Sequence, residues 1–509
     1  MATKKTTVKE NAGKKRKEKP EIVTPEITVT RKRRIVFAGS EAAPFIATGG
    51  LADVLGSLPA ELAKSEENEI SVILPLYSKI SGEYRKNFRF IGSFEVPLSW
   101  RRQYCGVFHY LYRNVNFYFI DNEYYFKRDG NIYGFYDDGE RYAFFSKAIL
   151  ETIGHFMLWP DVLHCNDWQT ALVPIYLKDA ATRWWEIRHI RTVFTIHNIE
   201  YQGRYGSDSV DQLFGLDRGW YDDGTLRMDG DVNLMKGAML MADAVTTVSP
   251  TYAAQLHDPA YAEGLESVVD AIGWKMHGVV NGIDTVTYDP ASDPALPAHY
   301  TAADPAGKAV CKASLQAALG LAQEPDTPLI AMVTRLVGHK GLDLVQQAMD
   351  GIMAAGCQFV VLGTGDGQYE DFFRWKAGQY PGRLSAQILY AEDLSRRIYA
   401  AADLFLMPSR SEPCGLSQMI AMRYGAVPIV RSTGGLADTV RSCQVGQEDG
   451  TGYLFGDYDT GAMLSVIGQA TGLYRGDRTG FDTVRYRGMT ADFSWGRSAA
   501  AYRHIYENL

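Results

Sequence analysis

Residues 34–62 read RIVFAGSEAAPFIATGGLADVLGSLPAEL and contain one complete structural unit. The first residues are an apolar, β-branched and aromatic run that ends at a glycine, which predicts a buried strand. Beyond the loop, leucine and valine recur at helical spacing, at positions 51, 54, 55, 58 and 62. The stretch therefore predicts a strand, a glycine-rich turn and a helix, the repeating unit of a parallel α/β sheet.

The same unit recurs along the chain in two series. In the first, strand-like runs end in polar or glycine loops at 70–77, 191–203, 243–249 and 277–284. The second begins at residue 328 with PLIAMVTRLVGHKGLDLVQQAMD and continues through CQFVVLGTGDGQYEDFF, DLFLMPS and VPIVRS. Between the two series, residues 287–309 are rich in proline, alanine and aspartate, a composition typical of a linker. The pattern predicts an α/β protein with two Rossmann-like domains.

The boundaries follow from these shifts in composition. The first domain is expected over 34–281, a linker over 282–309, the second domain over 310–490 and a final helical segment over 491–509. Residues 1–33 are expected to form a basic, disordered tail, because the first 34 residues carry twelve Lys and Arg, four Glu and little apolar surface. An electrostatic tether to an anionic partner is the alternative role for this tail.

Bulk composition excludes several classes of protein. A chain of 509 residues is too long for one hydrophobic core, and 46% apolar with 22% charged residues is ordinary for a globular protein. The net charge of −8 argues against nucleic acid or an anionic membrane as partner, and no apolar run reaches the roughly 20 residues that span a bilayer. The six cysteines are scattered, without a zinc or redox pair. We therefore expect a reduced, cytoplasmic protein.

The hexapeptide TGGLAD occurs twice, at 48–53 and at 433–438. In open α/β sheets ligands bind beyond the carboxyl ends of the strands. A glycine-rich turn at that place brings backbone N–H groups close to an anion at a helix N-terminus. One hypothesis is that the two turns, one in each domain, face each other across a deep cleft that holds an activated donor. The alternative is that both Gly-Gly pairs only make tight turns between strand and helix.

The residues around the second copy favour a ligand site. The loop TRLVGHKG places Arg335 and Lys340 after a strand, where two cations suit the diphosphate of a nucleotide sugar. The loop SEPCGL, with Glu412, Cys414 and Gly415, ends a neighbouring strand. Its lone carboxylate could cap a helix or orient the hydroxyls of a sugar.

Together these residues resemble those of the bacterial and plastid-type glycogen (starch) synthases, which are retaining glucosyltransferases of the GT-B architecture. The resemblance runs from about Arg34 to the end of the chain. It is carried by SEAAPFIATGGLADVLGSLP, DVLHCNDWQTAL, FTIHNIEYQG, VVNGID, TRLVGHKGLDL, LGTGDGQYE, PSRSEPCGLSQMIAMRYGAVPIVRSTGGLADTV and GTGYLF, in this order. It implies transfer of glucose from ADP-glucose to the non-reducing end of an α-1,4-glucan, with no metal and no cofactor.

The resemblance also implies roles for single residues on the donor side. Arg335 and Lys340 would hold the diphosphate, and Glu412 would bind the hydroxyls of the donor glucose. The remaining donor-binding residues are expected to be Ala47, Gly50, Tyr390, which would stack on adenine, Cys414, Gly415, and Thr433, Gly434 and Gly435, whose backbone would cradle the distal phosphate.

On the opposite wall, the resemblance places His197 beside the transferred glucose. Asp167 would line the acceptor side, and Glu41 and Asp53 would complete the N-terminal wall. The final segment, SWGRSAAAYRHIYENL, would cross back to the first domain as a helix.

Each of these residues also has a structural interpretation that the sequence leaves open. His197 could be a buried histidine with satisfied hydrogen bonds, Asp167 could cap a helix, and Tyr390 could be part of the core. Cys414 is better explained as a small packed residue than as a nucleophile, because no histidine lies near it in sequence.

Two other classes of enzyme fit less well. LGTGDG lacks the full spacing and the acidic partner of a dinucleotide fingerprint. The D-G-D at 229–231 resembles a metal-binding motif of other glycosyltransferases, but no histidine or carboxylate cluster accompanies it.

One departure from the family pattern raises a non-catalytic alternative. The family motif K-x-G-G-L has a lysine that reaches the diphosphate, whereas this chain has Ala47 there, and the next lysine is Lys64. The alternative is a catalytically weakened, glucan-binding relative.

Overall fold

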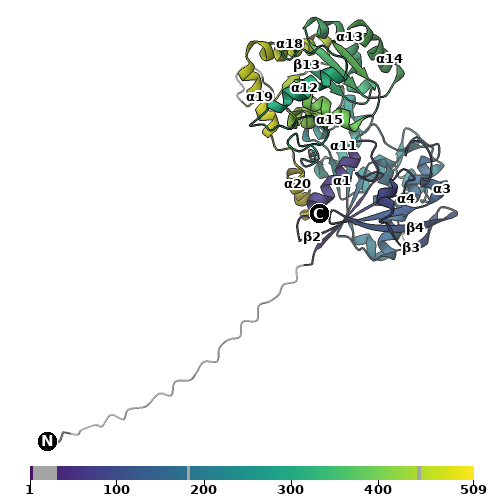
Figure 1. The fold of residues 1–509 in the computed structure, drawn as a ribbon. Coiled ribbons are helices and arrows are strands. Elements are labelled where there is room, and N and C mark those ends of the chain that lie inside the picture. The colour runs from purple at the N-terminus through teal and green to yellow at the C-terminus, as the bar shows by residue number, and fades with distance from the viewer. Residues whose placement is uncertain (4–30, 180–183, 444–448) are drawn as a thin grey trace.

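The computed structural model describes residues 1–3, 31–179, 184–443 and 449–509. Most of the expected basic tail, residues 4–30, lies outside the described residues. The rest of the chain forms two α/β domains, the first purple to blue and the second green to yellow in Figure 1. The α/β fold with two parallel-sheet domains, expected from the sequence, is confirmed.

Among the described residues, a nine-stranded sheet in the order β12-β11-β7-β6-β1-β2-β5-β4-β3 forms the first domain. Its strands are β1 (Arg33–Ala38), β2 (Asn68–Pro75), β3 (Arg89–Leu98), β4 (Arg101–Tyr112), β5 (Val115–Asp121), β6 (Val162–Asn166), β7 (Arg191–Ile196), β11 (Ala244–Thr247) and β12 (Met276–Gly278). Neighbours are parallel from β12 to β5, and the β5-β4-β3 end is antiparallel. A separate small sheet contains β8 (Arg204–Tyr205), β9 (Arg227–Met228) and β10 (Asp231–Asn233).

The helices of the first domain begin with α1, which is the helix predicted from the leucine spacing. The five leucine and valine positions identified in the sequence are all buried on its inner face. The others are α2 (Gly82–Arg85), α3 (Glu123–Phe126), α4 (Asp138–His155), α5 (Leu172–Lys178), α6 (Ser209–Gln212), α7 (Gly219–Asp222), α8 (Leu234–Met241), α9 (Pro250–Gln255), α10 (Pro259–Ala262) and α11 (Glu266–Ile272), and α1 itself spans Gly50–Leu62.

The second domain is built on a six-stranded sheet of described residues, parallel throughout, in the order β15-β14-β13-β16-β17-β18. The strands are β13 (Leu329–Val333), β14 (Gln358–Leu362), β15 (Leu384–Gln387), β16 (Leu404–Met407), β17 (Val427–Arg431) and β18 (Tyr453–Phe455). The helices are α12 (Ala306–Ala318), α13 (Leu342–Ala354), α14 (Gly367–Gln379), α15 (Glu392–Ala401), α16 (Ser417–Arg423), α17 (Gly434–Thr439), α18 (Thr460–Gly476) and α19 (Arg478–Thr490).

Both faces of this second sheet are covered, and β13 shows how. Leu329 and Ala331 belong to one buried apolar cluster, whereas Ile330 and Met332 belong to another. Successive side chains of a strand point to opposite faces, so a continuous apolar run places core residues on both sides. This burial explains why the strands of this domain read as short, uninterrupted hydrophobic runs.

The proline-rich stretch expected to be a linker is packed against the second domain. Tyr300 is 3% exposed, and its hydroxyl donates to the Tyr424 carbonyl at 2.8 Å. Asp293 is also buried and accepts from the Tyr424 hydroxyl. Helix α12 already begins at Ala306, inside the range expected for the linker. Composition predicts the lack of strands here, but not that two buried side chains anchor the segment.

The last helix, α20 (Trp495–Glu507), lies beside α1 of the first domain (Figure 1). Its buried face joins the core of that domain through Trp495, Tyr502 and Tyr506. The Tyr506 hydroxyl also lies 2.7 Å from Nδ1 of His164 on β6. Where the chain crosses between domains, the Ile283 N–H donates to the Phe493 carbonyl at 2.8 Å, so the two crossing segments run side by side.

Candidate active site

A cleft of about 1180 Å³ lies between the two domains. Its walls are loops that follow the carboxyl ends of strands in both sheets, where open α/β proteins bind their ligands. The residues expected from the sequence that line it are Glu41, Gly50, Asp53, Asp167, His197, Arg335, Lys340, Glu412, Cys414 and Gly415. The cleft is therefore the candidate active site.

An ion pair occupies the centre of the C-terminal wall. The Lys340 Nζ lies 2.8 Å from Oε1 and 2.7 Å from Oε2 of Glu412, and the Ser409 hydroxyl donates to the same carboxylate at 2.9 Å. Burial raises the pKa of Glu412, but the charge of Lys340 and these hydrogen bonds outweigh it and hold the pKa below its usual value. Glu412 is therefore a carboxylate at neutral pH.

A glycine makes this contact geometrically possible. Gly341, which follows Lys340, has a φ of +74°, and a Cβ there would lie 2.0 Å from the Pro408 carbonyl oxygen. Only glycine lets the lysine loop pack this closely against the loop that carries Glu412. The two loops follow adjacent strands, β13 and β16, so sheet topology and one glycine together build the pair.

Two further groups flank the ion pair. Arg335 is exposed in the cleft and forms no ion pair with another described residue. His339 lies between the domains, with Nδ1 4.0 Å from Oε2 of Glu200 on the opposite wall. Burial and the charge of Lys340 lower the pKa of His339. Arg335 is thus a cation on this wall that has no ion-pair partner among the described residues and can meet an anionic ligand.

Asp167 and His197 form the centre of the N-terminal wall. The Asp167 carboxylate accepts the backbone N–H of His197 at 2.8 Å. Asp167 has φ +56° and ψ 178°, a region that only glycine visits readily, and such strain in non-glycine residues clusters at functional sites. Burial raises the pKa of Asp167 to about 7. The carboxyl group can therefore exist in both protonation states near neutrality.

The His197 ring is neutral, because burial lowers its pKa to about 3. Its Nε2 lies 2.9 Å from Oδ1 of Asn166. The Asn166 amide is fixed, since its Nδ2 donates to the carbonyls of Ala38 and His164, so Oδ1 can only accept. The ring hydrogen is therefore on Nε2, and Nδ1 carries the lone pair.

Glu41 supports the first glycine-rich loop, and Asp53 lies at the end of that loop's TGGLAD sequence. Glu41 accepts from the backbone N–H and the hydroxyl of Thr48, and the Tyr133 hydroxyl lies 3.2 Å from it. Burial raises the pKa of Glu41. Burial, together with the charges of Glu41 and of Glu392 in the second domain, raises the pKa of Asp53 to about 6.

Several expected site residues do not line the cleft. Ala47 is exposed beside it, and Tyr390 is 86% exposed after β15. Thr433 is buried, and the Gly434 N–H donates to the Gln255 side chain at 2.9 Å. The Gly435 N–H donates to the backbone carbonyl of Glu412 at 3.2 Å. In this structure the second glycine pair therefore supports the Glu412 loop from behind. Cys414 does line the cleft, and burial raises the pKa of its thiol to about 12.

Other residues of the cleft were not identified from the sequence. They include Trp168, Gln169, Tyr261, Arg410 and Arg431. The Arg431 guanidinium lies 3.4 Å from the Tyr261 hydroxyl of the opposite domain. Arg410 lies two residues before Glu412, and Arg431 lies two residues before the second TGGLAD. Their positions inside the quoted motifs could have identified them as site residues. Trp168 and Gln169 likewise lie within the quoted motif DVLHCNDWQTAL, next to Asp167, whereas for Tyr261 no local signal exists.

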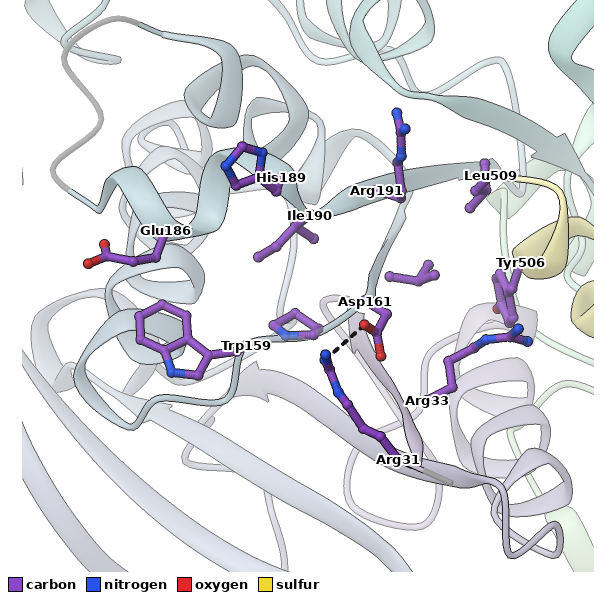
Figure 2. A pocket seen from close by; sticks show the side chains of 12 residues that line it. Arg31, Arg33, Trp159, Asp161, Glu186, His189, Ile190, Arg191, Tyr506 and Leu509 are labelled. Carbon is purple, nitrogen blue, oxygen red and sulfur yellow. Dashed lines mark hydrogen bonds and ion pairs between the residues drawn. The ribbon is translucent and has the colours of Figure 1, made fainter. Parts of the chain in front are cut away.

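A second hollow, of about 460 Å³, lies at the amino ends of β1, β6 and β7 (Figure 2). Its arginines are already paired. Arg31 binds Asp161 at 2.9 Å, Arg33 lies 3.6 Å from Glu507, and Arg191 lies 3.4 Å from Asp243. It therefore offers less free charge than the cleft, and it lies at the edge of the sheet where parallel α/β proteins do not place their ligands.

Metal and membrane features were sought in the part of the chain that the structure describes. There, no three His, Cys, Asp or Glu side chains are grouped so that they could hold a metal ion. In the same ranges, no helix is both long and apolar enough to cross a bilayer.

Comparison with known proteins assigns the chain to a family. The model of the starch synthase catalytic domain matches residues 34–271, and that of the glycosyl transferases group 1 matches residues 320–469. A glycogen synthase from Ligilactobacillus salivarius is 45% identical over 94% of this chain and all of its own length, and one from Clostridium acetobutylicum is 44% identical over the same shares. The chain belongs to the glycogen and starch synthase family.

Solved structures agree with this family and with its GT-B fold. The catalytic domain of starch synthase IV from Arabidopsis thaliana, bound to ADP and acarbose, matches with a TM-score of 0.87 and 33% identity, covering 94% of this chain and 99% of that one. A sucrose-phosphate synthase from Thermosynechococcus elongatus matches with a TM-score of 0.58 at 17% identity, which shows a shared fold alone. In this glycogen and starch synthase family member, the first family model spans the strands of the first domain up to β11, and the second spans β13 to β18, the whole sheet of the second domain.

Proposed function

We propose that the protein transfers glucose from ADP-glucose to the non-reducing 4-hydroxyl of an α-1,4-glucan, with retention of configuration. The observation that supports this most is the pairing of two unlike walls in one cleft. Cations and the Glu412 carboxylate line one side, and the neutral His197 and the buried Asp167 line the other. Such an arrangement suits an anionic donor that meets an uncharged sugar acceptor.

The C-terminal wall would carry the chemistry of the leaving group. As the bond between the anomeric carbon and the diphosphate breaks, negative charge develops on ADP, and Arg335 and Lys340 would neutralise it. Glu412, ionised at neutral pH, would accept hydrogen bonds from the donor glucose. Because Lys340 is hydrogen-bonded to Glu412, donor binding would divide this lysine between the carboxylate and the diphosphate.

The N-terminal wall would receive the acceptor. His197 stays neutral, so it would contact the transferred glucose without adding charge. Asp167 would line the acceptor side. Glu41 would hold the first glycine-rich loop in place through Thr48. Asp53 would complete this wall, and Gly50 would allow the donor to approach the loop closely.

The proposal includes partners and setting. ADP-glucose and a glycogen- or starch-type glucan would be the substrates, with no metal, cofactor, nucleic acid or membrane taking part. Tyr390 would close on adenine from its exposed position. The net charge of −8 and the six free cysteines fit a cytoplasmic enzyme.

The direct test is incorporation of labelled glucose into glycogen from ADP-glucose and, separately, from UDP-glucose, with and without EDTA. We expect transfer from ADP-glucose that EDTA does not reduce. Glu412→Ala should lower kcat by roughly 10²-fold or more with a smaller change in KM, because the group acts mainly in the transition state. Glu123→Ala, which removes an exposed carboxylate outside the cleft, should retain wild-type kcat.

An unchanged kcat in the Glu412 variant would make that residue structural. If the wild type binds glucan and transfers no glucose from either donor, the weakened, glucan-binding alternative raised by Ala47 replaces the proposal. Activity that depends on a divalent ion would overturn the metal-free mechanism.

A further inference from the structure

One short helix of the first domain contacts loops on both sides of the cleft. Helix α9 carries Tyr252, whose buried hydroxyl accepts the backbone N–H of Ile199 at 3.2 Å. Ile199 lines the cleft two residues after His197. The last residue of the helix, Gln255, extends its side chain to the second domain. Helix α9 therefore joins the loop of His197 to the opposite wall.

The Gln255 side chain holds the second TGGLAD turn. Its Oε1 accepts the backbone N–H of Gly434 at 2.9 Å, and its Nε2 donates to the Thr433 hydroxyl at 3.2 Å. Thr433 and Gly434 are both buried. A buried N–H that lacks a partner costs free energy, so this group needs an acceptor from the protein. The turn in the second domain therefore depends on an acceptor that the first domain supplies.

This turn packs directly on the backbone of Glu412. The Gly435 N–H donates to the carbonyl oxygens of Glu412 and Pro413, at 3.2 and 3.1 Å. Gly434 lies so close that a Cβ on it would be 2.0 Å from the same Glu412 oxygen. Closely packed interiors transmit displacements, so a shift of the turn moves Glu412 with it. Two contacts thus lead from Gln255 to Glu412.

The same hydrogen bonds bear on how the turn could meet a ligand. The backbone N–H groups of Thr433, Gly434 and Gly435 all donate to acceptors of the protein. An anion could bind this turn only by displacing one of those acceptors. Gln255 is the one that is a side chain, so competition with the donor is the alternative to a supporting role. Kinetics distinguish the two roles, because a competitor affects KM and a support affects kcat.

We propose that Gln255 positions Glu412 from across the domain boundary, by holding the turn on which the Glu412 backbone rests. Because α9 also holds the loop after His197, this residue fixes the two walls of the cleft relative to each other. Gln255 is a positioning residue, and no bond is made or broken at its side chain. Its effect on the reaction rests on the proposed function, whereas its support of the turn can be measured without turnover.

The test is Gln255→Met, which keeps the length of the side chain and removes the acceptor oxygen. A displacement of about 1 Å at a reacting group can cost about 10²-fold in rate. The turn loses one of several supports, so we expect a smaller loss of kcat, roughly 10-fold, with unchanged KM for ADP-glucose and for glucan. Gln255→Glu keeps an acceptor oxygen at the same place and should retain most of the wild-type kcat.

Thr251→Val is the matched control. The Thr251 hydroxyl donates to Asp438 at 2.6 Å, so it links the same two helices, α9 and α17, without contacting the glycines of the turn. Its loss should lower the melting temperature about as much as Gln255→Met does and should leave kcat unchanged. Without substrates, hydrogen exchange of the Gly434 amide should be roughly 10-fold faster in Gln255→Met and unchanged in Thr251→Val.

In a wild type that transfers glucose, three results would overturn the inference. They are an unchanged kcat in Gln255→Met, an equal loss of kcat in Thr251→Val, and a kcat in Gln255→Glu as low as that of the methionine variant. An unchanged kcat with a lower KM for ADP-glucose would show that Gln255 competes with the donor.

The exchange measurement separates this inference from the proposed function. If the wild type transfers no glucose but exchange at Gly434 rises in Gln255→Met alone, the support of the turn stands and the proposed function fails. If the wild type transfers no glucose and exchange at Gly434 is the same in all variants, both fail.

Discussion

The two copies of TGGLAD share a sequence and differ in almost everything else. Both begin a helix, α1 in the first domain and α17 in the second. In the first copy, Gly49 is extended and exposed, and a Cβ there would meet nothing within 4 Å. In the second, Gly434 has φ +44°, and a Cβ would lie 2.0 Å from the Glu412 carbonyl oxygen.

Their aspartates differ as well. Asp53 of the first copy faces the cleft, and burial raises its pKa to about 6. Asp438 of the second copy accepts from the N–H of Thr251 at 3.0 Å and from its hydroxyl at 2.6 Å, and so ties α17 to α9 of the other domain. Local sequence thus specifies the turn into a helix, and the packing around it decides whether the peptide faces a ligand or supports the site from behind.

The largest expected effect is that of Gly434→Ala. The new methyl group would push the backbone of Glu412, and a displacement of about 1 Å at a reacting group can cost about 10²-fold in rate. We expect kcat to fall by roughly that factor in the glucose-transfer assay. Gly49→Ala is the comparison, with a smaller loss of kcat and an unchanged melting temperature, because a Cβ there meets no protein atom within 4 Å. Equal losses in the two variants would show that both glycine pairs serve the same purpose.

The next effect is a gain on Ala47→Lys. A charge-assisted hydrogen bond to phosphate contributes about 1.5–3 kcal/mol, which corresponds to roughly a 10- to 100-fold rise in kcat/KM for ADP-glucose. The gain should shrink as salt is added, because the contact is partly exposed. Ser432→Lys, at the same position relative to the second copy, should bring no gain. If neither lysine raises kcat/KM, another group already fills the role of the family lysine.

A third prediction concerns two aspartate substitutions that should change the free energy of unfolding in opposite directions. The folded-state pKa of Asp53 lies above its usual 3.8, so the free energy of unfolding falls as pH rises from about 4 to about 6. Asp53→Asn removes this loss and should raise the free energy of unfolding by about 1–3 kcal/mol at pH 7. Asp438→Asn should instead lower the free energy of unfolding by about 1 kcal/mol. The substitution replaces one carboxylate oxygen that accepts from Thr251 by an NH2 group, which can only donate. Melting temperatures measured between pH 4 and 8 test this, and a shift of the same sign in both variants would contradict it.

The smallest expected effect is a difference in hydrogen exchange. If the cleft closes on substrates, ADP with maltotetraose should slow exchange of amides 48–50 several-fold, because Thr48, Gly49 and Gly50 are exposed. Amides 434–439 are already packed between the domains and should change little. Equal protection of both copies would mean that the second copy also contacts the ligand.

Much of the fold could be predicted from the sequence, because an element that is regularly buried has a regular pattern of apolar residues. The apolar runs of β1 and β13 and the leucine face of α1 are strong local signals. The antiparallel strands β3 and β4 were missed, since their residues are mostly exposed or half-buried and no clean alternation marks them. A half-solvated strand at the edge of a sheet resembles a polar loop when only its neighbours in sequence are considered.

The contacts of the candidate site also divide into those that the sequence predicts and those that it does not. Lys340 and Glu412 could be placed together because each lies in a loop after a strand of one sheet, and topology brings such loops together. The contact of Gly434 with Gln255 could not be predicted from the sequence, because Gln255 lies in the other domain.

The position of α20 has a consequence for how the protein is made. The helix contributes Trp495, Tyr502 and Tyr506 to the core of the first domain, yet the ribosome synthesises it only after the whole second domain. During synthesis, the first domain therefore lacks α20 and exposes part of its apolar core to water until the second domain has been made. A nonsense mutation in the codons just before α20 would therefore damage the domain that was translated first.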